Sequence, residues 1–308
     1  MPEVRPDKKH HSHITATSLH HHAEAAAARL PALMIAAERV ASTIAQGVHG
    51  RRRIGQGEAF WQFRPYADGD ATSRIDWRQS AKSDRVYVRE TEWEAAQSVW
   101  IARDPSGSMD YRSSPELPTK RERADLIALA IAVLLIRGGE HIALHGSGSP
   151  PRTGRATLTR LATRLTNNDG TMPDAGSESV VPRHGTLIAI GDFLEPREAI
   201  SDMLREHAAR GVRGHIVHII DPAEAKLPFE GRVRYEGLEG ERALLIGRTE
   251  SVRDDYRQFF ADRIEAVRSF ATQAGWRYDR HITERPVEPT LLGLYTALSK
   301  PERSFAHA

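Results

Sequence analysis

The stretch Ser98–Met109, with the sequence SVWIARDPSGSM, decides the fold that we expect for this chain. It opens with a short apolar run typical of a buried strand and ends in an Asp-x-Ser-x-Ser pattern. At the carboxyl end of a parallel strand, that pattern places one carboxylate and two hydroxyls around one point, from Asp104, Ser106 and Ser108. Such hard oxygen ligands suit Mg²⁺, which prefers near-octahedral oxygen coordination. The stretch therefore predicts a strand end that binds a divalent cation.

Strand-like and helix-like segments alternate after this stretch. We expect strands at 141–144, 186–190, 214–220 and 276–281. We expect helices at 120–137, 156–165, 196–210, 253–274 and 289–298, and a small antiparallel excursion at 232–235 and 243–246. Strands that alternate with helices indicate an α/β fold with a mostly parallel sheet covered on both faces.

Two of the predicted strands end in an aspartate, at Asp104 and at Asp192. In an open parallel sheet, ligands bind outside the carboxyl ends of the strands, where the strand order reverses. If these two strands are neighbours, both carboxylates face the same crevice as the two serines. A threonine between them in the chain completes the predicted donor set; the first candidate is Thr171, and the alternatives are Thr166 and Thr157.

The composition excludes several classes of protein. Of 308 residues, 27% are charged and 40% hydrophobic, and the net charge is only +2, which does not favour nucleic-acid binding. The absence of cysteine excludes disulfides and thiolate metal sites and fits a reducing compartment. No apolar run approaches the about 18–20 residues of a membrane span, and no signal-peptide core is present at residues 1–22. We therefore expect a cytoplasmic protein.

The N-terminal part divides into three segments of different composition. Residues 1–22 contain six histidines among polar residues and are expected to be a disordered tail. Residues 23–46 have the period of an amphipathic helix. The rest, up to residue 95, is rich in aromatic residues, arginine and aspartate, and contains a half-exposed strand at 86–91. We interpret it as a structured loop pinned by buried rings and Arg–Asp pairs, packed on the sheet.

We therefore predict four segments in the chain: a tail at 1–22, a helix and extension at 23–95, the α/β domain at 96–298, and a C-terminal tail at 299–308.

Two sets of residues resemble known families. The pattern Asp104-x-Ser106-x-Ser108, together with Asp192, resembles the metal-ion-dependent adhesion site of von Willebrand factor A domains. A second block resembles the signature of the bacterial "domain of unknown function 58" family; it comprises Phe63-Arg64-Pro65-Tyr66, Gly69-Asp70, Arg74-Ile75-Asp76-Trp77 and Ser80-Ala81. Further matches to that family are Ile190-Gly191-Asp192-Phe193, Ile220-Asp221-Pro222-Ala223-Glu224 and Tyr256. The resemblance covers roughly residues 47–298.

The resemblance implies a von Willebrand factor A-like, doubly wound sheet with the four residues Asp104, Ser106, Ser108 and Asp192 as the metal shell. The hydroxyls would bind Mg²⁺ or Mn²⁺ directly, and at least one carboxylate would bind through water. A coordination position stays open for a Glu or Asp of a partner. Family members are typically encoded beside MoxR-type AAA+ ATPases. The resemblance thus implies an adaptor for such an ATPase, acting in the assembly or maturation of another complex, such as a metalloenzyme or an envelope component.

A non-enzymatic interaction module is accordingly the function that we expect. The alternative is a Mg²⁺-dependent phosphohydrolase, but an aspartyl nucleophile at Asp104 needs a second carboxylate two residues later, where Ser106 stands. His145 is an imaginable base, although a lone histidine at a strand end is usually structural. The chain has neither a Walker A sequence nor a Gly-x-Ser-x-Gly elbow. Aspartates interspersed among the arginines of the extension argue against nucleic-acid binding.

Overall fold

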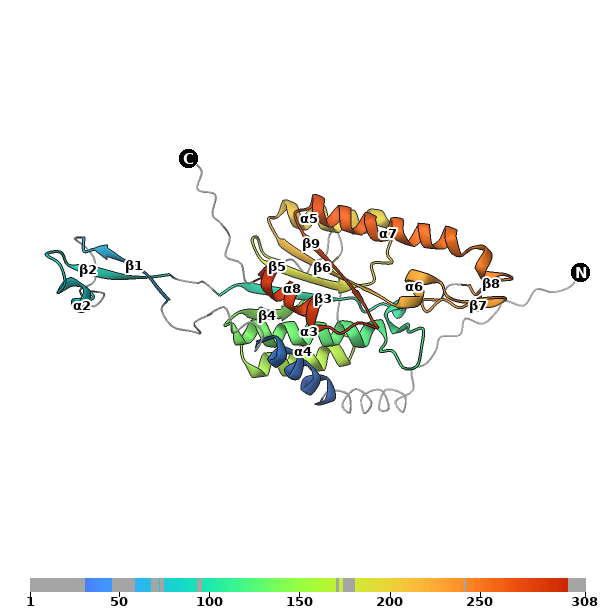
Figure 1. The fold of residues 1–308 in the computed structure, drawn as a ribbon, viewed down its shortest axis with the longest axis horizontal. Coiled ribbons are helices and arrows are strands. Elements are labelled where there is room, and N and C mark those ends of the chain that lie inside the picture. The colour runs from blue at the N-terminus through green and yellow to red at the C-terminus, as the bar shows by residue number, and fades with distance from the viewer. Residues whose placement is uncertain are drawn as a thin grey trace, which may run out of the picture.

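A five-stranded parallel sheet forms the centre of the molecule (Figure 1). Its strand order is β4-β3-β5-β6-β9, and the bounds are Ser98–Arg103 for β3, His141–Leu144 for β4, Thr186–Gly191 for β5, Arg213–Ile220 for β6 and Arg277–Ile282 for β9. The computed structural model describes residues 31–45, 59–67, 72, 75–92, 96–169, 172–173, 181–240 and 242–298. The predicted α/β class with a mostly parallel sheet is confirmed.

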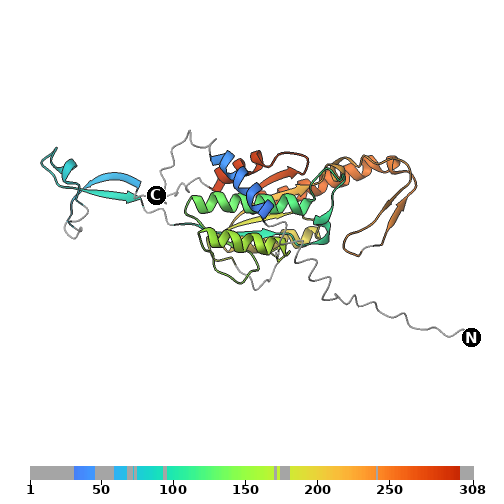
Figure 2. The same ribbon diagram turned by 90° about the horizontal axis from the view of Figure 1, so that it is seen from below.

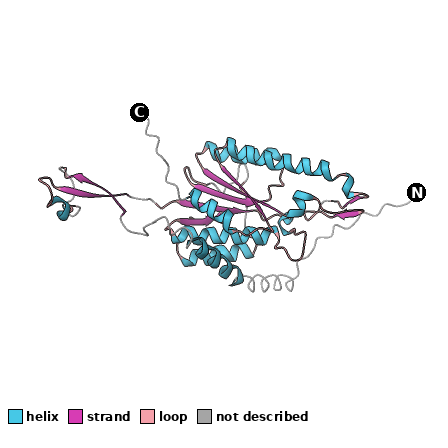
Figure 3. Cartoon of the chain, viewed as in Figure 1, coloured by secondary structure: helices cyan, strands magenta, loops and turns pink. Residues whose placement is uncertain are grey.

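Helices cover both faces of the sheet, as Figure 3 shows in cyan against the magenta strands. One face is covered by a helix at 31–45, α3 (Lys120–Arg137), α4 (Arg155–Thr166) and α8 (Glu288–Leu298). The other face is covered by α5 (Arg197–Ala209) and α7 (Arg253–Gln273). Each face has its own apolar cluster, so the molecule has three layers of helix, sheet and helix.

Strand β3 shows why both faces are apolar. Val99 and Ile101 join the cluster under α3, whereas Ala102 joins the cluster under α5 and α7. Successive side chains of a strand point to opposite faces, so a central strand of a doubly covered sheet is apolar along its whole length. Helix α3 is buried almost all round, between the sheet, α4 and α8, and every residue from 127 to 135 is buried.

The strand order reverses between β3 and β5. The chain passes from β3 to β4 on one side and then returns to place β5 on the other side of β3. The two strands that end in Asp104 and Asp192 are thus neighbours, paired from Val99 with Thr186 to Arg103 with Ile190. The two Asp-terminated strands are therefore neighbours, as a shared crevice requires, and they lie at the switch point where ligands bind in such sheets.

Two small elements follow β6 at the same end of the sheet. Helix α6 (Pro222–Lys226) comes directly after the strand, and β7 (Val233–Tyr235) and β8 (Leu244–Ile246) form an antiparallel hairpin. This is the predicted antiparallel excursion. Figure 1 places both elements beyond the ends of the sheet strands, beside the start of α7.

The extension differs from its prediction in two ways. It is a hairpin of β1 (Ala59–Pro65) and β2 (Tyr87–Glu92) with the short helix α2 (Trp77–Ser80), and only β2 was expected as a strand. The Trp77 side chain is 68% exposed, so the prediction of buried rings is wrong for this residue. Asp76 caps α2 by accepting a hydrogen bond of 2.9 Å from the Gln79 amide.

The helix at 31–45 packs on the central sheet, and its Ala37, Val40, Ala41 and Ile44 lie in the core. The packing on the sheet that was predicted for the extension itself is not seen for β1, β2 and α2, which Figures 1 and 2 both draw beyond the edge of the main body. The two strands pair with each other, which satisfies the backbone groups on their facing edges without the central sheet.

The two predicted tails, at 1–22 and 299–308, lie outside the described residues. Within the described ranges, no helix combines the length and apolar character that crossing a bilayer requires.

Candidate functional site at the carboxyl edge of the sheet

Hydrogen bonds link four of the five predicted site residues into one cluster, through the Ser106 amide and the two serine hydroxyls. Oδ1 of Asp104 accepts a hydrogen bond of 2.9 Å from the amide of Ser106. The hydroxyls of Ser106 and Ser108 lie 3.0 Å apart, and Oγ of Ser108 donates to Oδ2 of Asp192 at 2.7 Å. Residues 84 positions apart in the sequence therefore meet at one point.

The predicted threonine is not found among these residues. Thr171 lies outside the described residues. The two alternative threonines both donate their hydroxyl hydrogens to nearby backbone carbonyls. Thr157 donates to the carbonyl of Thr153 at 3.0 Å, and Thr166 donates to that of Thr163 at 2.8 Å. Neither alternative is therefore brought into the cluster.

A glycine at the end of β5 lets the two strand ends meet. The amide of Asp104 donates to the carbonyl of Ile190 at 3.0 Å, which extends the ladder past β3. A Cβ on Gly191 would lie 2.8 Å from Cβ of Asp104 and 3.0 Å from its Oδ2. The Asp104 side chain thus fills the space that any larger residue at 191 would need.

Lys120 brings a cation into the site that sequence analysis did not anticipate. Its Nζ lies 2.8 Å from Oδ2 of Asp192 and 2.5 Å from Oε1 of Glu224, and its side chain is 1% exposed. Two capping boxes position Lys120 and Glu224. In α3 the N-cap is Thr119, which pairs with Glu122, and Lys120 is the first helical residue. In α6 the N-cap is Asp221, which pairs with Glu224. The signal in the sequence was a Thr-x-x-Glu and an Asp-x-x-Glu pattern, each at the start of a helix.

The electrostatics distinguish the two aspartates. Burial and the charge of Asp192 raise the pKa of Asp104. Burial alone would also raise the pKa of Asp192, but the Lys120 ammonium and the hydrogen bonds it receives outweigh this effect and lower it. Lys120 has a raised pKa, since its two carboxylate partners outweigh burial. Asp104 is therefore the carboxylate that lacks a cation: it forms no ion pair with a described residue.

Burial also raises the pKa of two nearby glutamates. Glu224 has a raised pKa although the Lys120 ammonium opposes this. Glu195, three residues after Asp192, has its pKa raised to about 7 by burial, and the charges of Asp104 and Asp192 add to the shift. The Arg263 guanidinium opposes the shift at Glu195, so both Lys120 and Arg263 act on the carboxyl groups at this end of the sheet.

Two polar side chains hold the backbone of the turn Pro105-Ser106. Arg121 donates to the carbonyl of Ser106 at 2.8 Å, and Asn168 donates to that of Pro105 at 3.0 Å. Arg103 points the other way from Asp104, as strand alternation requires, and its Nε lies 2.9 Å from Oδ1 of Asp125 on α3. These contacts make the turn a rigid platform for its two hydroxyls.

The loop between β7 and β8 lies against the same turn. Oε1 of Glu239 accepts a hydrogen bond of 3.2 Å from the amide of Ser108. A Cβ on Gly107 would lie 2.5 Å from the carbonyl oxygen of Leu238, so the turn needs glycine where the loop touches it. The chain itself thus places one more carboxylate at the rim of the cluster.

The oxygen atoms of Asp104, Ser106, Ser108 and Asp192 are of the kind that binds a hard divalent cation, but few of them are charged and one carboxylate is already paired. Two carboxylates and two hydroxyls match the oxygen ligands of Mg²⁺ or Mn²⁺. No group of three or more histidine, cysteine or acidic side chains in a metal-binding arrangement occurs in the part of the chain that is described. A cation here would depend on the serine hydroxyls and would share Asp192 with the Lys120 ammonium.

Comparison with known proteins identifies related sequences. The sequence model of the family described as "Protein of unknown function DUF58" matches residues 62–266. The uncharacterized protein Rv1480 of Mycobacterium tuberculosis (strain ATCC 25618 / H37Rv) is 27% identical over 265 residues, which cover 79% of this chain and 80% of the relative. The uncharacterized protein Mb1516 of Mycobacterium bovis matches with the same identity and coverage.

Two solved structures resemble this chain distantly. One is the conserved hypothetical protein BatB of Bacteroides thetaiotaomicron, with 16% identity and a TM-score of 0.41 over 67% of this chain and 100% of that one. The other is an aerotolerance-related membrane protein of Bacteroides fragilis NCTC 9343, with 14% identity and a TM-score of 0.40 over 65% of this chain and 98% of that one.

Proposed function

We propose that this chain, which belongs to the DUF58 family, is a non-enzymatic interaction module that binds a partner's carboxylate through a divalent cation. The observation behind the proposal is the hydrogen-bonded cluster that joins Asp104, through the Ser106 amide and the hydroxyls of Ser106 and Ser108, to Asp192. Such a von Willebrand factor A-like adhesion site holds its cation with few charged ligands. The cation then keeps affinity for an outside Glu or Asp.

The charges around the cluster support a site that a partner completes. Asp104 is buried without a cation partner among the described residues, and a divalent ion at the serines would compensate its charge. The Lys120 ammonium already binds one oxygen of Asp192, which weakens this ligand for a metal. We therefore expect modest metal affinity in the isolated chain and tighter binding when a partner's carboxylate adds a further negative charge.

The proposal includes an adaptor role. The residues that resemble the "domain of unknown function 58" signature suggest action beside a MoxR-type AAA+ ATPase, in the cytoplasm, on an unidentified client complex. The absence of cysteine is consistent with that compartment.

A Mg²⁺-dependent phosphohydrolase is the second candidate, and one observation favours it. Glu195 has a pKa of about 7 and lies close enough to both aspartates for their charges to raise it, as a general acid or base would require. Against this candidate, Ser106 stands where a phosphohydrolase with an aspartyl nucleophile has its second carboxylate. A phosphatase assay with Mg²⁺ decides between the two functions: turnover that Glu195→Gln abolishes would support the enzyme.

Calorimetric titration with Mg²⁺ and Mn²⁺ tests the site directly. We expect binding by the wild type and loss of binding in Asp104→Asn and in Ser106→Ala, with circular dichroism confirming that both variants stay folded. Ser114→Ala is the matched control, because Ser114 follows in the same loop but outside the cluster, and its hydroxyl accepts a hydrogen bond from the Glu116 amide. Absence of binding by the wild type at millimolar concentration, with acetate present as a surrogate partner carboxylate, would contradict the proposal.

A further inference from the structure

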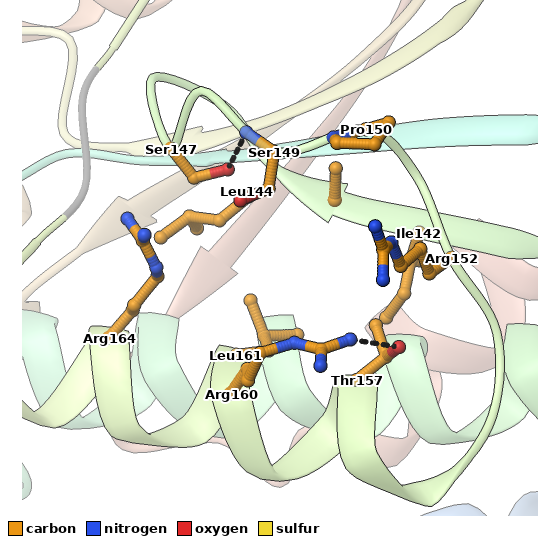
Figure 4. Close-up of a pocket in the computed structure, with 11 residues that line it drawn as sticks. Ile142, Leu144, Ser147, Ser149, Pro150, Arg152, Thr157, Arg160, Leu161 and Arg164 are labelled. Carbon is orange, nitrogen blue, oxygen red and sulfur yellow. Dashed lines mark hydrogen bonds between the residues drawn. The ribbon is translucent and has the colours of Figure 1, made fainter.

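A cavity of about 250 Å³ lies at the edge strand β4, between that strand, helix α4 and the loop at 146–154 (Figure 4). Three arginines line it: Arg152, Arg160 and Arg164. Its polar lining also includes Ser147, Ser149 and Thr157, and its apolar lining includes Ile142, Leu144 and Leu161. None of the residues of the Asp104 cluster lines this cavity.

No carboxylate of a described residue forms an ion pair with the three arginines that line the cavity. Arg160 and Arg164 are one turn apart on α4. Figure 4 shows the side chains of Arg152 and Arg160 at one end of the cavity and that of Arg164 at the other end, near Ser147. Arg160 donates to the hydroxyl of Thr157 at 3.0 Å. The ion pairs among the described residues involve other cations, such as those of Lys120 and Arg210. Like charges at this spacing repel, and an anion between them would relieve the repulsion.

Rigid elements hold the arginines in place. The backbone of Arg152 exchanges two hydrogen bonds of 2.9 Å with Ile142, which closes the edge of β4 at that residue. Helix α4 is anchored by the buried side chains of Leu158, Leu161, Ala162 and Leu165. Because both elements are fixed by their own contacts, the backbone positions of the arginines are set before a ligand binds, although the side chains of Arg152 and Arg160 are exposed.

We propose that this cavity binds the phosphate group of a small organic phosphate monoester. A guanidinium group binds phosphate oxygens through two parallel hydrogen bonds. Three arginines match the double negative charge of a phosphate monoester better than the single charge of a carboxylate ligand. The hydroxyls of Ser147 and Ser149 would donate further hydrogen bonds, whereas that of Thr157 already donates to the carbonyl of Thr153. The aliphatic side chains accommodate the organic part, which must be compact because the cavity is at the small end of ligand-binding sites.

Calorimetric titration of the metal-free full-length protein with phenyl phosphate tests the proposal. We expect binding by the wild type and a loss of about tenfold or more in affinity in the double variant Arg160→Gln/Arg164→Gln. The matched control is Arg155→Gln, which removes an exposed arginine of the same helix that does not line the cavity. This control should keep wild-type affinity.

Three results would overturn the proposal. They are no binding of phenyl phosphate by the wild type, an equal loss of affinity in Arg155→Gln, and equal affinities for phenyl phosphate and inorganic phosphate. The last result would reveal an unspecific anion site that makes no use of the apolar lining. Ser106→Ala is expected to bind phenyl phosphate like the wild type, so the outcome is independent of whether the Asp104 cluster holds a metal.

Discussion

The ammonium of Lys120 lies 2.8 Å from Oδ2 of Asp192, the same oxygen that accepts the hydroxyl hydrogen of Ser108. A cation is therefore part of the cluster before any metal binds. The ammonium stabilises the charged form of Asp192 and leaves Asp104 as the carboxylate that still needs a positive charge. A divalent ion has to compete with Lys120 for one of its ligands, so the two cations are coupled through Asp192.

The first prediction concerns Lys120→Met. This change leaves Asp192 and Glu224 buried without their cation, so we expect a loss of about 3–5 kcal/mol in the free energy of unfolding. Mg²⁺ should restore part of that loss and should stabilise this variant more than the wild type, as measured by urea unfolding with and without the ion. Arg137→Met, which breaks the exposed pair with Glu38, should cost at most about 1 kcal/mol. Equal stabilisation of wild type and Lys120→Met by Mg²⁺ would refute the coupling.

Gly191→Ala tests the close approach of the two strand ends. The new Cβ would meet Cβ of Asp104 at 2.8 Å, so we expect a loss of about 1–3 kcal/mol in the free energy of unfolding and weaker metal binding. Gly247→Ala is the matched control, since nothing lies within 4 Å of a Cβ at that position. Denaturant unfolding and metal titration of both variants provide the comparison. A fully stable Gly191→Ala would mean that Asp104 can move aside.

Glu239→Ala tests whether the loop between β7 and β8 covers the Ser106–Ser108 turn. The Ser108 amide donates to Oε1 of Glu239, so its hydrogen exchange should become several-fold faster when the carboxylate is removed, with global stability changed by less than about 0.5 kcal/mol. Glu236→Ala removes an exposed carboxylate of the same loop that pairs with Arg234 instead, and should leave the Ser108 amide unchanged. Unaltered exchange in Glu239→Ala would show that the loop does not protect the turn.

The pH dependence of stability is expected to reflect Glu195. Its pKa in the folded chain is raised to about 7, above the usual value of 4.5, so the folded state binds more protons than the unfolded state between these values. Stability should therefore fall as pH rises from about 4.5 to 7 and then level off. Glu195→Gln should remove this component. The free energy of unfolding of the variant minus that of the wild type should therefore be larger at pH 8 than at pH 5, by roughly 1–2 kcal/mol in urea unfolding.

A control for this prediction is Glu198→Gln on an exposed position of α5. It measures, at the same two pH values, the effect of removing an exposed carboxylate close to Glu195 in the sequence. If Glu195→Gln behaves in the same way as this control, the Glu195 carboxyl does not have a raised pKa in the folded chain.

Local patterns in the sequence predicted most of the α/β core. The observed bounds of α3 and β4 are those expected, because a long apolar helix with a Thr-x-x-Glu start and a Gly-Gly end leaves little choice of conformation. Strand β1 was missed for an equally local reason. Its register shifts between Phe60 and Gln62 and it ends at Pro65, which obscures the two-residue period.

The exposure of Trp77 could not be predicted from its neighbours in the sequence. Whether a ring is buried depends on what packs against it, and α2 lies on a hairpin whose strands pair with each other. An aromatic residue in a dense, charged segment favours burial only on average.

That an Asp-x-Ser-x-Ser turn follows a buried strand can be read from the local sequence, because strand period, turn chemistry and helix caps act over a few residues. The groups that surround the turn depend on long-range packing. The strand order reverses beside β3, which brings in Asp192, Lys120 from the start of α3, and Glu239 from 131 residues away. The cation that balances the site is set by the way the sheet is wound, since Coulomb forces act between groups close in space, wherever they lie along the chain.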